Sequence, residues 1–163
     1  MTKLAEESVY IETTIPSLYT GRPSPRIVEA ARQQLTREWW DKERLSYRLV
    51  TSQTVHDECA KGEPEMAQRR VQMLSGIPLL HLSDPVAEIA KELLARQIIP
   101  TKAADDAIHI AVASVHGIGY LLTWNCKHLA NPRIWWPVSK IISRFGYTPS
   151  VICTPEDLIG DED

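Results

Sequence analysis

The sequence predicts an α/β fold: one domain in which helices cover both faces of a mostly parallel sheet. Short apolar segments with strand character alternate along the chain with longer segments whose apolar residues recur at helical spacing. Strands that alternate with helices form right-handed βαβ units, and such units place the strands in parallel. The length of 163 residues, with 44% hydrophobic and 24% charged residues, indicates a single folded domain spanning residues 1–163.

The first half of the chain contributes two predicted strands and three predicted helices. Val9–Ile11 is β-rich and is followed directly by polar residues, which is typical of a buried strand that ends there. In residues 26–41 the apolar positions recur at helical spacing, so an amphipathic helix is expected. Ser52 or Thr54 is placed to cap the next helix, and Pro64 to begin the one after it. In order, we expect a strand at 9–11, a helix at 26–41, a strand at 45–50, a helix that stops at 61–62 and a helix from 64 to about 74.

The second half adds three predicted strands and three predicted helices. Ser83 and Pro85 provide a cap and a first-turn proline for one helix. Residues 103–115 are apolar on nearly every side, which predicts a helix buried in the middle of the fold. In order, we expect a strand at 77–82, a helix at 86–96, a helix at 103–115, a strand at 120–124, a helix at 138–145 and a strand at 150–153.

The charge and the cysteines exclude several classes of protein. The formal charge is −3 and the isoelectric point is near 6.0, so bulk positive charge does not hold nucleic acid to this chain. Three widely spaced cysteines do not form a secreted disulfide framework. Met1–Glu7 has no signal-peptide pattern, and no window holds the roughly 18 apolar residues needed to cross a bilayer. We therefore expect a cytoplasmic protein without membrane contact, with an acidic tail at 156–163 that frays.

Five polar residues are expected to converge at one edge of the sheet. Glu12 and Asn125 each follow a predicted strand, Glu58 lies on a helix, and two acids, Asp105 and Asp106, open the buried helix. Ligands of open α/β sheets bind outside the carboxyl ends of the strands. Oxygen ligands without a Lys or Arg nearby in the local sequence favour a hard divalent cation, Mg²⁺ or Mn²⁺, because burial of unpaired carboxylates is otherwise costly. Such an ion activates water for in-line attack, so the pattern predicts phosphodiester hydrolysis.

Simpler interpretations of these acids stay open. The helix dipole favours acids in a first helical turn, which explains Asp57 and is sufficient for Asp105 and Asp106. A strand-end acid such as Glu12, followed by two threonines, also fits an ordinary turn. Adjacent helical residues point about 100° apart, so at most one of the two aspartates is expected at the centre of a site. His109 shares a face with Asp106 and is expected to be a buried residue that hydrogen-bonds near the acids.

Zinc is a weaker alternative. His56 with Cys59, or Cys126 with His128, offers the right ligand types, but these spacings match no zinc motif closely. Nucleotide-binding and serine-hydrolase motifs are absent from the sequence.

A basic, aromatic-rich stretch follows the strand at 120–124. Residues 124–150 include four Lys or Arg residues and no acid. In this stretch, Lys127 and Arg133 are placed to contact the phosphates of single-stranded nucleic acid, while aromatic rings stack on unpaired bases. For Trp135 and Trp136, a place in the core or at a dimer surface is an equal alternative.

Four short motifs follow one another along the chain. They are VYIETT at 9–14, SQTVHDE at 52–58, DAIHIA at 106–111 and LLTWN at 121–125. In order and spacing they resemble the motifs of PIN domains, and most closely those of the VapC-like toxins of bacterial toxin–antitoxin pairs, over nearly the whole chain. The resemblance implies a three-layer α/β/α fold, an acidic Mg²⁺ or Mn²⁺ site and endoribonuclease activity. It also implies a cognate antitoxin that masks the site, and a homodimer for which Trp39-Trp40 or Trp135-Trp136 is a candidate surface.

The resemblance assigns roles to particular positions. Glu12 stands where the family usually has its first Asp, and Asn125 stands where a fourth Asp is usual. Glu58 and Asp106 match the second and third acids. The implied catalytic residues are Glu12, Glu58, Asp106 and Asn125, and the implied metal ligands are Glu12, Glu58, Asp105 and Asp106. In this scheme Asn125 keeps an oxygen ligand without its charge, and Asp105 supplies a replacement carboxylate.

Two rival hypotheses accompany this assignment. The departures at Glu12 and Asn125 also fit a PIN-like module that has lost catalytic activity and instead binds RNA or a protein partner. A receiver-like phosphoacceptor domain needs an acceptor Asp at the end of a middle strand. Asp84, the candidate after the strand at 77–82, is instead marked as part of a helix start by Pro85.

Overall fold

A parallel sheet lies at the centre of the computed structural model, which describes residues 7–160. Within these residues the strands are β1 (Ser8–Ile11), β2 (Arg48–Val50), β3 (Tyr120–Leu122) and β4 (Val151–Cys153). Their spatial order is β2-β1-β3-β4, and all three neighbouring pairs are parallel. The predicted α/β class is therefore confirmed, and the carboxyl ends of all these strands meet at one edge of the sheet.

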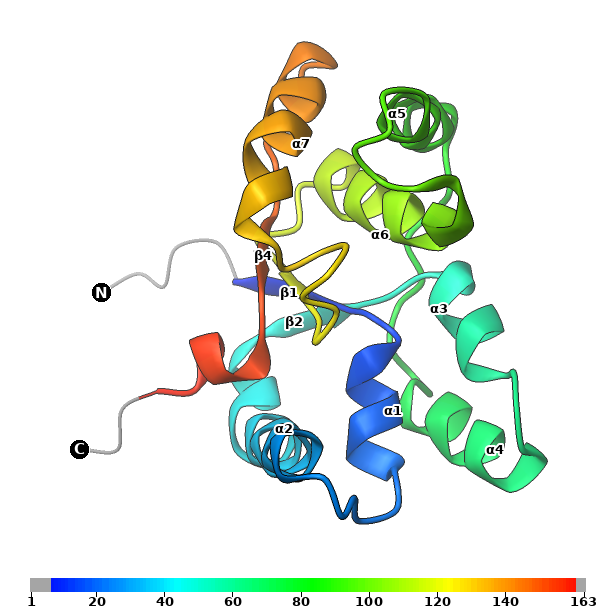
Figure 1. Cartoon of the computed structure of the whole chain (residues 1–163), viewed down its shortest axis with the longest axis vertical. Helices are drawn as coiled ribbons and strands as arrows, with labels where there is room; N and C mark the ends of the chain where they lie inside the picture. Colours follow the sequence, from blue (N-terminus) through cyan, green and yellow to red (C-terminus); the bar gives the residue numbers. More distant parts are fainter. Residues whose placement is uncertain (1–6, 161–163) are drawn as a thin grey trace.

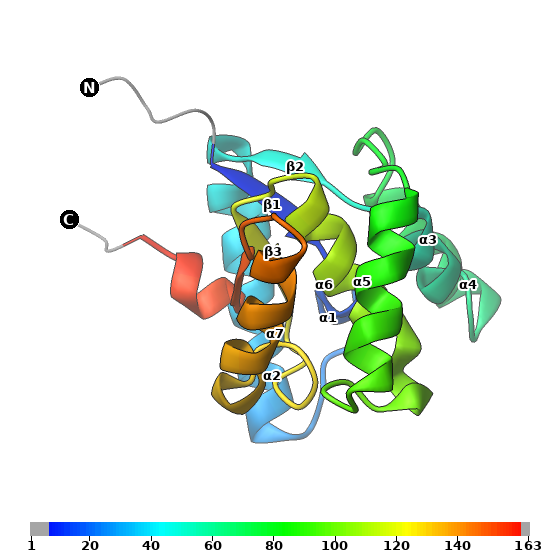
Figure 2. The same ribbon diagram turned by 90° about the horizontal axis from the view of Figure 1, so that it is seen from above.

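Helices cover both faces of this sheet. The described helices are α1 (Thr14–Thr20), α2 (Ile27–Glu38), α3 (Gln53–Cys59), α4 (Pro64–Met73), α5 (Asp84–Ala95), α6 (Ala104–Val115) and α7 (Pro132–Arg144). In Figure 1, α1, α2 and α4 lie on one side of the strands, and α5, α6 and α7 lie on the other. Figure 2, seen from above, shows α5, α6 and α7 from their outer side. This is the three-layer α/β/α arrangement that was expected.

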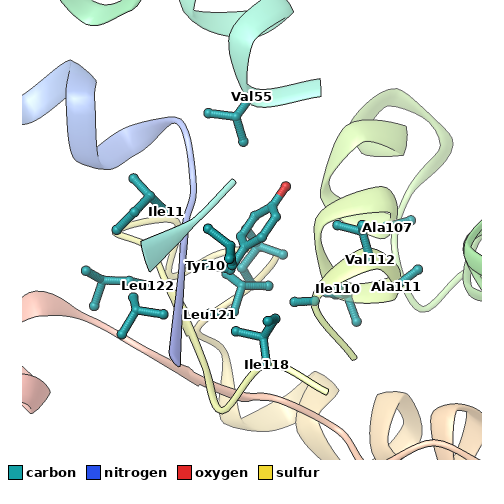
Figure 3. Close-up of a cluster of buried hydrophobic side chains, with 14 of the residues drawn as sticks. Tyr10, Ile11, Val55, Ala107, Ile110, Ala111, Val112, Ile118, Leu121 and Leu122 are labelled. Atoms are coloured by element: carbon teal, nitrogen blue, oxygen red, sulfur yellow. The ribbon is translucent and has the colours of Figure 1, made fainter. Parts of the chain in front are cut away.

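The core is built around β1, which is buried along its whole length because it has a neighbour on each side and helices above and below. The ring of Tyr10 lies among aliphatic side chains of α6 and β3, and its hydroxyl oxygen points towards Val55 of α3 (Figure 3). A buried tyrosine hydroxyl needs a hydrogen-bond partner. Tyr10 finds this partner among the polar residues of the sheet edge.

Small residues allow α6 to lie deep in the fold, as predicted for 103–115. Ala107, Ala111 and Ala113 are fully buried and let the helix backbone approach its neighbours closely. The same helix buries two polar side chains, Asp106 and His109. The close packing of α6 thus fixes the position of the groups that face the strand ends.

Helix α1 is an element that the sequence analysis does not predict. The helix begins at Thr14, so Pro16 falls in the first turn, where backbone N–H groups have no partner within the helix. Proline is therefore tolerated there. Its missing N–H removes no helical hydrogen bond.

The predicted strand at 77–82 is wrong. Only Leu79 pairs in this segment, as a single bridge to Thr51, and Leu79 and Leu82 are partly exposed. Pro78 has no N–H, so its backbone can only accept a hydrogen bond, which comes from Thr51 N. The segment thus adds a single bridge, with two backbone hydrogen bonds to Thr51, and no fifth strand among the described residues.

Several predicted boundaries shift. Leu45 is exposed in a short 3₁₀ turn, so the strand expected at 45–50 begins only at Arg48. The helix expected at 26–41 ends at Glu38 and continues as one π-helical turn. The helix expected at 138–145 begins at Pro132, because Asn131 caps it by accepting a hydrogen bond from Arg133 N.

The acidic tail is partly ordered, contrary to prediction. Pro155–Leu158 forms a 3₁₀ helix in which Thr154 and Asp157 make reciprocal capping hydrogen bonds. Residues 1–6 and 161–163, on which parts of the terminal predictions fall, lie outside the described residues. No helix in the described part of the chain is both long and apolar enough to span a bilayer.

Candidate active site at the carboxyl edge of the sheet

The predicted polar residues gather at the carboxyl edge of the sheet. Glu12 follows β1 directly, and Asn125 comes three residues after the end of β3. Glu58 reaches this edge from α3, while Asp105 and Asp106 reach it from the first turn of α6. A cavity of about 390 Å³ opens there, lined by Glu58, Lys102, Ala103, Ala104, Asp105, Asp106 and His128.

Glu12 is buried and held by threonines. Its Oε2 accepts hydrogen bonds from the backbone N–H of Thr14 (3.0 Å), from the Thr14 hydroxyl (2.5 Å) and from the Thr123 hydroxyl (2.8 Å). Burial raises the pKa of the Glu12 carboxyl, and the charge of His109 together with these hydrogen bonds opposes that rise. The threonines therefore fix the direction of the carboxylate and offset part of its desolvation.

Glu58 and His109 form the central pair of the site. The fully buried His109 approaches Glu58 Oε1 with Nε2 at 2.6 Å, and the Thr13 hydroxyl donates to the same oxygen at 2.8 Å. Burial acts to lower the pKa of His109, but the hydrogen bond to Glu58 and the charges of three nearby carboxylates outweigh it and raise the pKa. Burial acts to raise the pKa of Glu58, but the His109 hydrogen bond and charge outweigh it and lower the pKa. Both shifts favour an imidazolium beside a carboxylate.

A buried hydrogen-bond chain extends from this pair into the core. As an imidazolium, His109 donates from Nδ1 to the Tyr10 hydroxyl at 2.8 Å, and Tyr10 then donates to the Ser52 hydroxyl at 2.7 Å. Ser52 caps α3 by accepting from Val55 N. Burial raises the pKa of Tyr10, which keeps its hydroxyl protonated. The predicted buried, hydrogen-bonded role of His109 is confirmed, and its chain of partners connects α6, β1 and α3.

Asp106 is bound by the turn that follows β3. Its Oδ2 accepts from Asn125 Nδ2 at 3.2 Å and lies 3.2 Å from His128 Nδ1. Burial raises the pKa of Asp106, opposed by the charges of His109 and His128. Asn125 Oδ1 accepts from the backbone N–H groups of Lys127 and His128, so the amide oxygen is held within the turn. In this arrangement Asn125 presents its NH₂ group to Asp106 and positions that carboxylate.

The two adjacent aspartates differ, as helix geometry predicts. Both line the cavity, but Asp106 is 9% exposed and hydrogen-bonded, whereas Asp105 is more exposed. The expectation of no nearby cation is wrong, because Lys102 lines the same cavity and the charge of Lys61 acts on Glu58. Lys102 precedes the acids by one helical turn, in a 3₁₀ segment. The site therefore mixes carboxylates with cations.

The carboxylates retain oxygen atoms for an ion. Among the described residues, every hydrogen bond to Glu12, Glu58 and Asp106 goes to one oxygen of each group, namely Oε2, Oε1 and Oδ2. The second oxygen of each has no protein donor in this part of the chain, and hard oxygen donors suit Mg²⁺ or Mn²⁺. In residues 7–160, however, no group of three or more His, Cys, Asp or Glu side chains is arranged to hold a metal ion as it stands. The donor set fits a hard dication chemically, and binding requires these side chains to move together.

The residues expected to bind nucleic acid lie beside this site. Lys127 is on the β3–α7 turn next to Asn125, and Arg133 is in the first turn of α7; both are exposed. Trp136 is 66% exposed and Trp135 is 38% exposed, so neither belongs to the core. Trp124, by contrast, is buried and donates from Nε1 to the Thr36 hydroxyl at 2.7 Å.

Burial also decides between the two candidate dimer surfaces. Trp39 is fully buried and Trp40 is 8% exposed, so this pair is part of the core and the prediction that it forms a surface is wrong. Trp135-Trp136 stays available for that role.

Sequence reasoning missed the residues that orient the acids. Thr13, Thr14 and Thr123 bind Glu58 and Glu12, and their signal was their position next to strand-end acids. His128 and Lys102 were missed as site residues because their contacts depend on how α6 and the β3–α7 turn pack.

No protein-family model matches the chain, and a search of curated proteins finds no match either.

Proposed function

We propose that this protein is a Mg²⁺- or Mn²⁺-dependent endoribonuclease that hydrolyses phosphodiester bonds of single-stranded or structured RNA. The observation that carries the proposal is the convergence of Glu12, Glu58 and Asp106 at the carboxyl edge of the sheet, each with one oxygen atom unused by the protein. The cavity lined by Glu58 and Asp106 is open to solvent and large enough to receive a phosphate group. The resemblance to VapC-like PIN domains points to the same chemistry.

In this proposal the acids hold the ion and other residues hold the acids. Glu12, Glu58 and Asp106 are the ligands, with Asp105, which lines the cavity, as a further carboxylate. A bound divalent cation supplies a Lewis acid and lowers the pKa of a coordinated water.

The remaining polar residues have supporting roles. His109, between the carboxylates, limits their mutual repulsion before an ion binds. Lys102 lines the cavity, where its positive charge faces an incoming phosphate, and His128 lines the same cavity. Asn125 positions Asp106 through its NH₂ group.

The decisive experiment is cleavage of a mixed-sequence single-stranded RNA in Mn²⁺, Mg²⁺ or EDTA. Glu58→Gln and Asp106→Asn should lose activity by at least about a hundredfold while remaining folded, because each removes a charged oxygen ligand. Asp57→Asn is the matched control, since Asp57 is an exposed neighbour of Glu58 on α3 whose carboxylate accepts only from Gln53 in the described structure. Full metal-dependent cleavage by Asp106→Asn would refute the assignment.

A second candidate is a non-catalytic PIN-like module that binds RNA or a protein partner. It is favoured by the hydrogen bonds that already hold the acids, above all the one between His109 and Glu58 at 2.6 Å. Calorimetry separates the two candidates. Heat from Mn²⁺ binding that disappears in Asp106→Asn supports the nuclease, whereas no binding by the folded wild-type protein supports the module.

The proposed setting is the cytoplasm, with an antitoxin as partner and a homodimer as the active form. Cys59, Cys126 and Cys153 are all free thiols, which suits a reducing compartment. A partner that covers the acidic cavity would block the proposed activity. The exposed Trp135-Trp136 pair is the candidate dimer surface, and sedimentation of Trp136→Ser against the wild-type protein tests it.

A further inference from the structure

A second hollow is lined by Thr14, which hydrogen-bonds Glu12. It has a volume of about 450 Å³ and includes residues of α1, the start of α2 and the turn after β3. Its main lining residues are Thr14, Ser17, Arg26, Val28, Arg32 and Trp124. We call it the Arg26–Arg32 groove.

Hydrogen bonds connect this groove to the proposed active site. Thr14 lines the groove and donates its hydroxyl to Glu12 Oε2 at 2.5 Å. The same hydroxyl accepts from the backbone N–H of Trp124 at 2.8 Å. Trp124 is followed directly by Asn125, which contacts Asp106 in the acidic cavity. The lining of the second hollow is therefore linked to the acidic cavity through the residues that hold Glu12 and Asp106.

The groove contains two arginines with unused hydrogen-bonding capacity. Arg32 lies over the Trp124 ring at 5.3 Å from its centroid, an arrangement that fixes a planar guanidinium and leaves its N–H edge accessible. Within residues 7–160, neither Arg32 nor Arg26 places its guanidinium in an ion pair or a hydrogen bond. Several other arginines are so engaged, to backbone carbonyls or to glutamates: Arg37, Arg44, Arg69, Arg70 and Arg96.

The one acid of the groove does not neutralise these arginines. Glu29 accepts a hydrogen bond from the Ser24 hydroxyl at 2.8 Å and forms no ion pair with a described residue. The groove thus carries net positive charge next to a site that is rich in carboxylates. This charge contrast fits a strand whose phosphates bind on one flank while a single phosphodiester enters the acidic cavity.

We propose that the Arg26–Arg32 groove binds the phosphates of the RNA strand on one side of the scissile bond. The proposal rests on the ribonuclease function above and adds the path of the substrate. Lys127 and Arg133 follow Asn125 in the chain, on the β3–α7 turn and in the first turn of α7, whereas Trp124 of the groove precedes it. Trp124 is 8% exposed and covered by Arg32, so it offers no free ring for stacking. The groove therefore reads the sugar–phosphate backbone and not the bases, and its contribution is independent of sequence.

The test is RNA binding without cleavage. A fluorescent single-stranded 20-mer is titrated with protein in EDTA at 50 and 200 mM salt, for wild type, Arg26→Gln/Arg32→Gln and Lys91→Gln. Loss of two phosphate contacts makes the slope of log affinity against log salt less steep by about 1.4. The factor by which affinity falls between the two salt concentrations should therefore be about seven times smaller for the double variant than for wild type. Lys91→Gln removes an exposed cation of α5, far from the groove, and should leave the slope unchanged.

A further variant separates charge from structure. Arg32→Lys keeps the positive charge and removes the planar stack on Trp124, so it should keep most of the salt slope with a severalfold lower affinity. Circular dichroism confirms that each variant is folded.

The groove proposal and the nuclease proposal are refuted by different experimental outcomes. The groove proposal is refuted by a double variant that keeps the wild-type salt slope, or by wild-type protein that binds no RNA. The metal-dependent cleavage assay tests the nuclease proposal separately. If poly-glutamate binds the wild-type protein but not the double variant, and RNA binds both equally, the groove is a site for an acidic peptide. This result also overturns the proposal.

Discussion

Replacement of His109 by glutamine tests the electrostatic logic of the site most directly. His109 is fully buried and contacts both Glu58 Oε1 at 2.6 Å and the Tyr10 hydroxyl at 2.8 Å. A glutamine amide can reach only one of these partners and carries no charge. A hydrogen bond to a charged group contributes about 1.5–3 kcal/mol and a neutral one about 1 kcal/mol. We therefore expect His109→Gln to lower the free energy of unfolding by about 2–4 kcal/mol.

The pH dependence of this loss is specific. The folded-state pKa of His109 is raised, so its stabilisation is fully present below the unfolded-state value of about 6.5 and is lost as pH rises through the folded-state pKa. The folded-state pKa of Glu58 is lowered, so its stabilisation is present above the unfolded-state value of about 4.3 and is lost as pH falls through the folded-state pKa. The difference between wild type and His109→Gln should thus be largest at about pH 5–6 and shrink towards alkaline pH.

Urea denaturation from pH 4 to pH 9 measures this difference. His81→Gln is the matched control, since this histidine is exposed and should change the free energy of unfolding by less than about 0.5 kcal/mol. A difference between wild type and His109→Gln that stays constant across the pH range would show that His109 acts only by filling space. A difference that grows above pH 8 would refute the charge argument altogether.

Two further predictions concern stability around the site. Thr14→Val removes the hydroxyl that donates to Glu12 and accepts from Trp124 N. Thermal denaturation should therefore show a loss of about 1–3 kcal/mol in the free energy of unfolding. An unchanged melting temperature would mean that the buried carboxylate needs no donor there. Ala111→Leu places extra methylenes on the fully buried face of α6 and should cost about 1–3 kcal/mol, whereas the same change at the exposed Ala95 should be nearly neutral. Equal effects at the two alanines would contradict the close packing of α6.

The fold was predictable where the sequence pattern is strong. The burial of α6 followed from its lack of a polar face, and the parallel sheet followed from the alternation of elements. Prediction failed where a residue or segment is compatible with two different local structures. Pro16 fits a turn or a first helical turn equally well, and the apolar segment at 77–82 has strand character but makes only one bridge. Such choices depend on tertiary neighbours that local sequence does not contain.

The candidate site was predictable in its members but not in its contacts. The placement of Glu12, Glu58 and Asp106 at one edge followed from the rule that ligands bind at the carboxyl ends of parallel strands. The direction of each carboxylate depends instead on hydrogen bonds from threonines and histidines that lie far away in the sequence, such as Thr123 to Glu12. The orientation of Asn125 is of the same kind, because it is set by two backbone N–H groups of its own turn.

Glu12 and Asn125, the two positions that differ from the PIN motifs the sequence resembles, are both held by hydrogen bonds in the structure. Glu12, one methylene longer than Asp, reaches the hydroxyls of both Thr14 and Thr123 with a single oxygen. Asn125, with an NH₂ group in place of a carboxylate oxygen, donates to Asp106 where an Asp would repel it. The change at Asn125 replaces repulsion between two carboxylates by a hydrogen bond, whereas Glu12 keeps its charge and is held by threonine hydroxyls. The charge of His109 also reduces the repulsion among the acids. The site is therefore stabilised without an ion. A divalent cation must compete with these internal partners, which makes its affinity for wild-type protein the quantity that decides between a nuclease and a binding module.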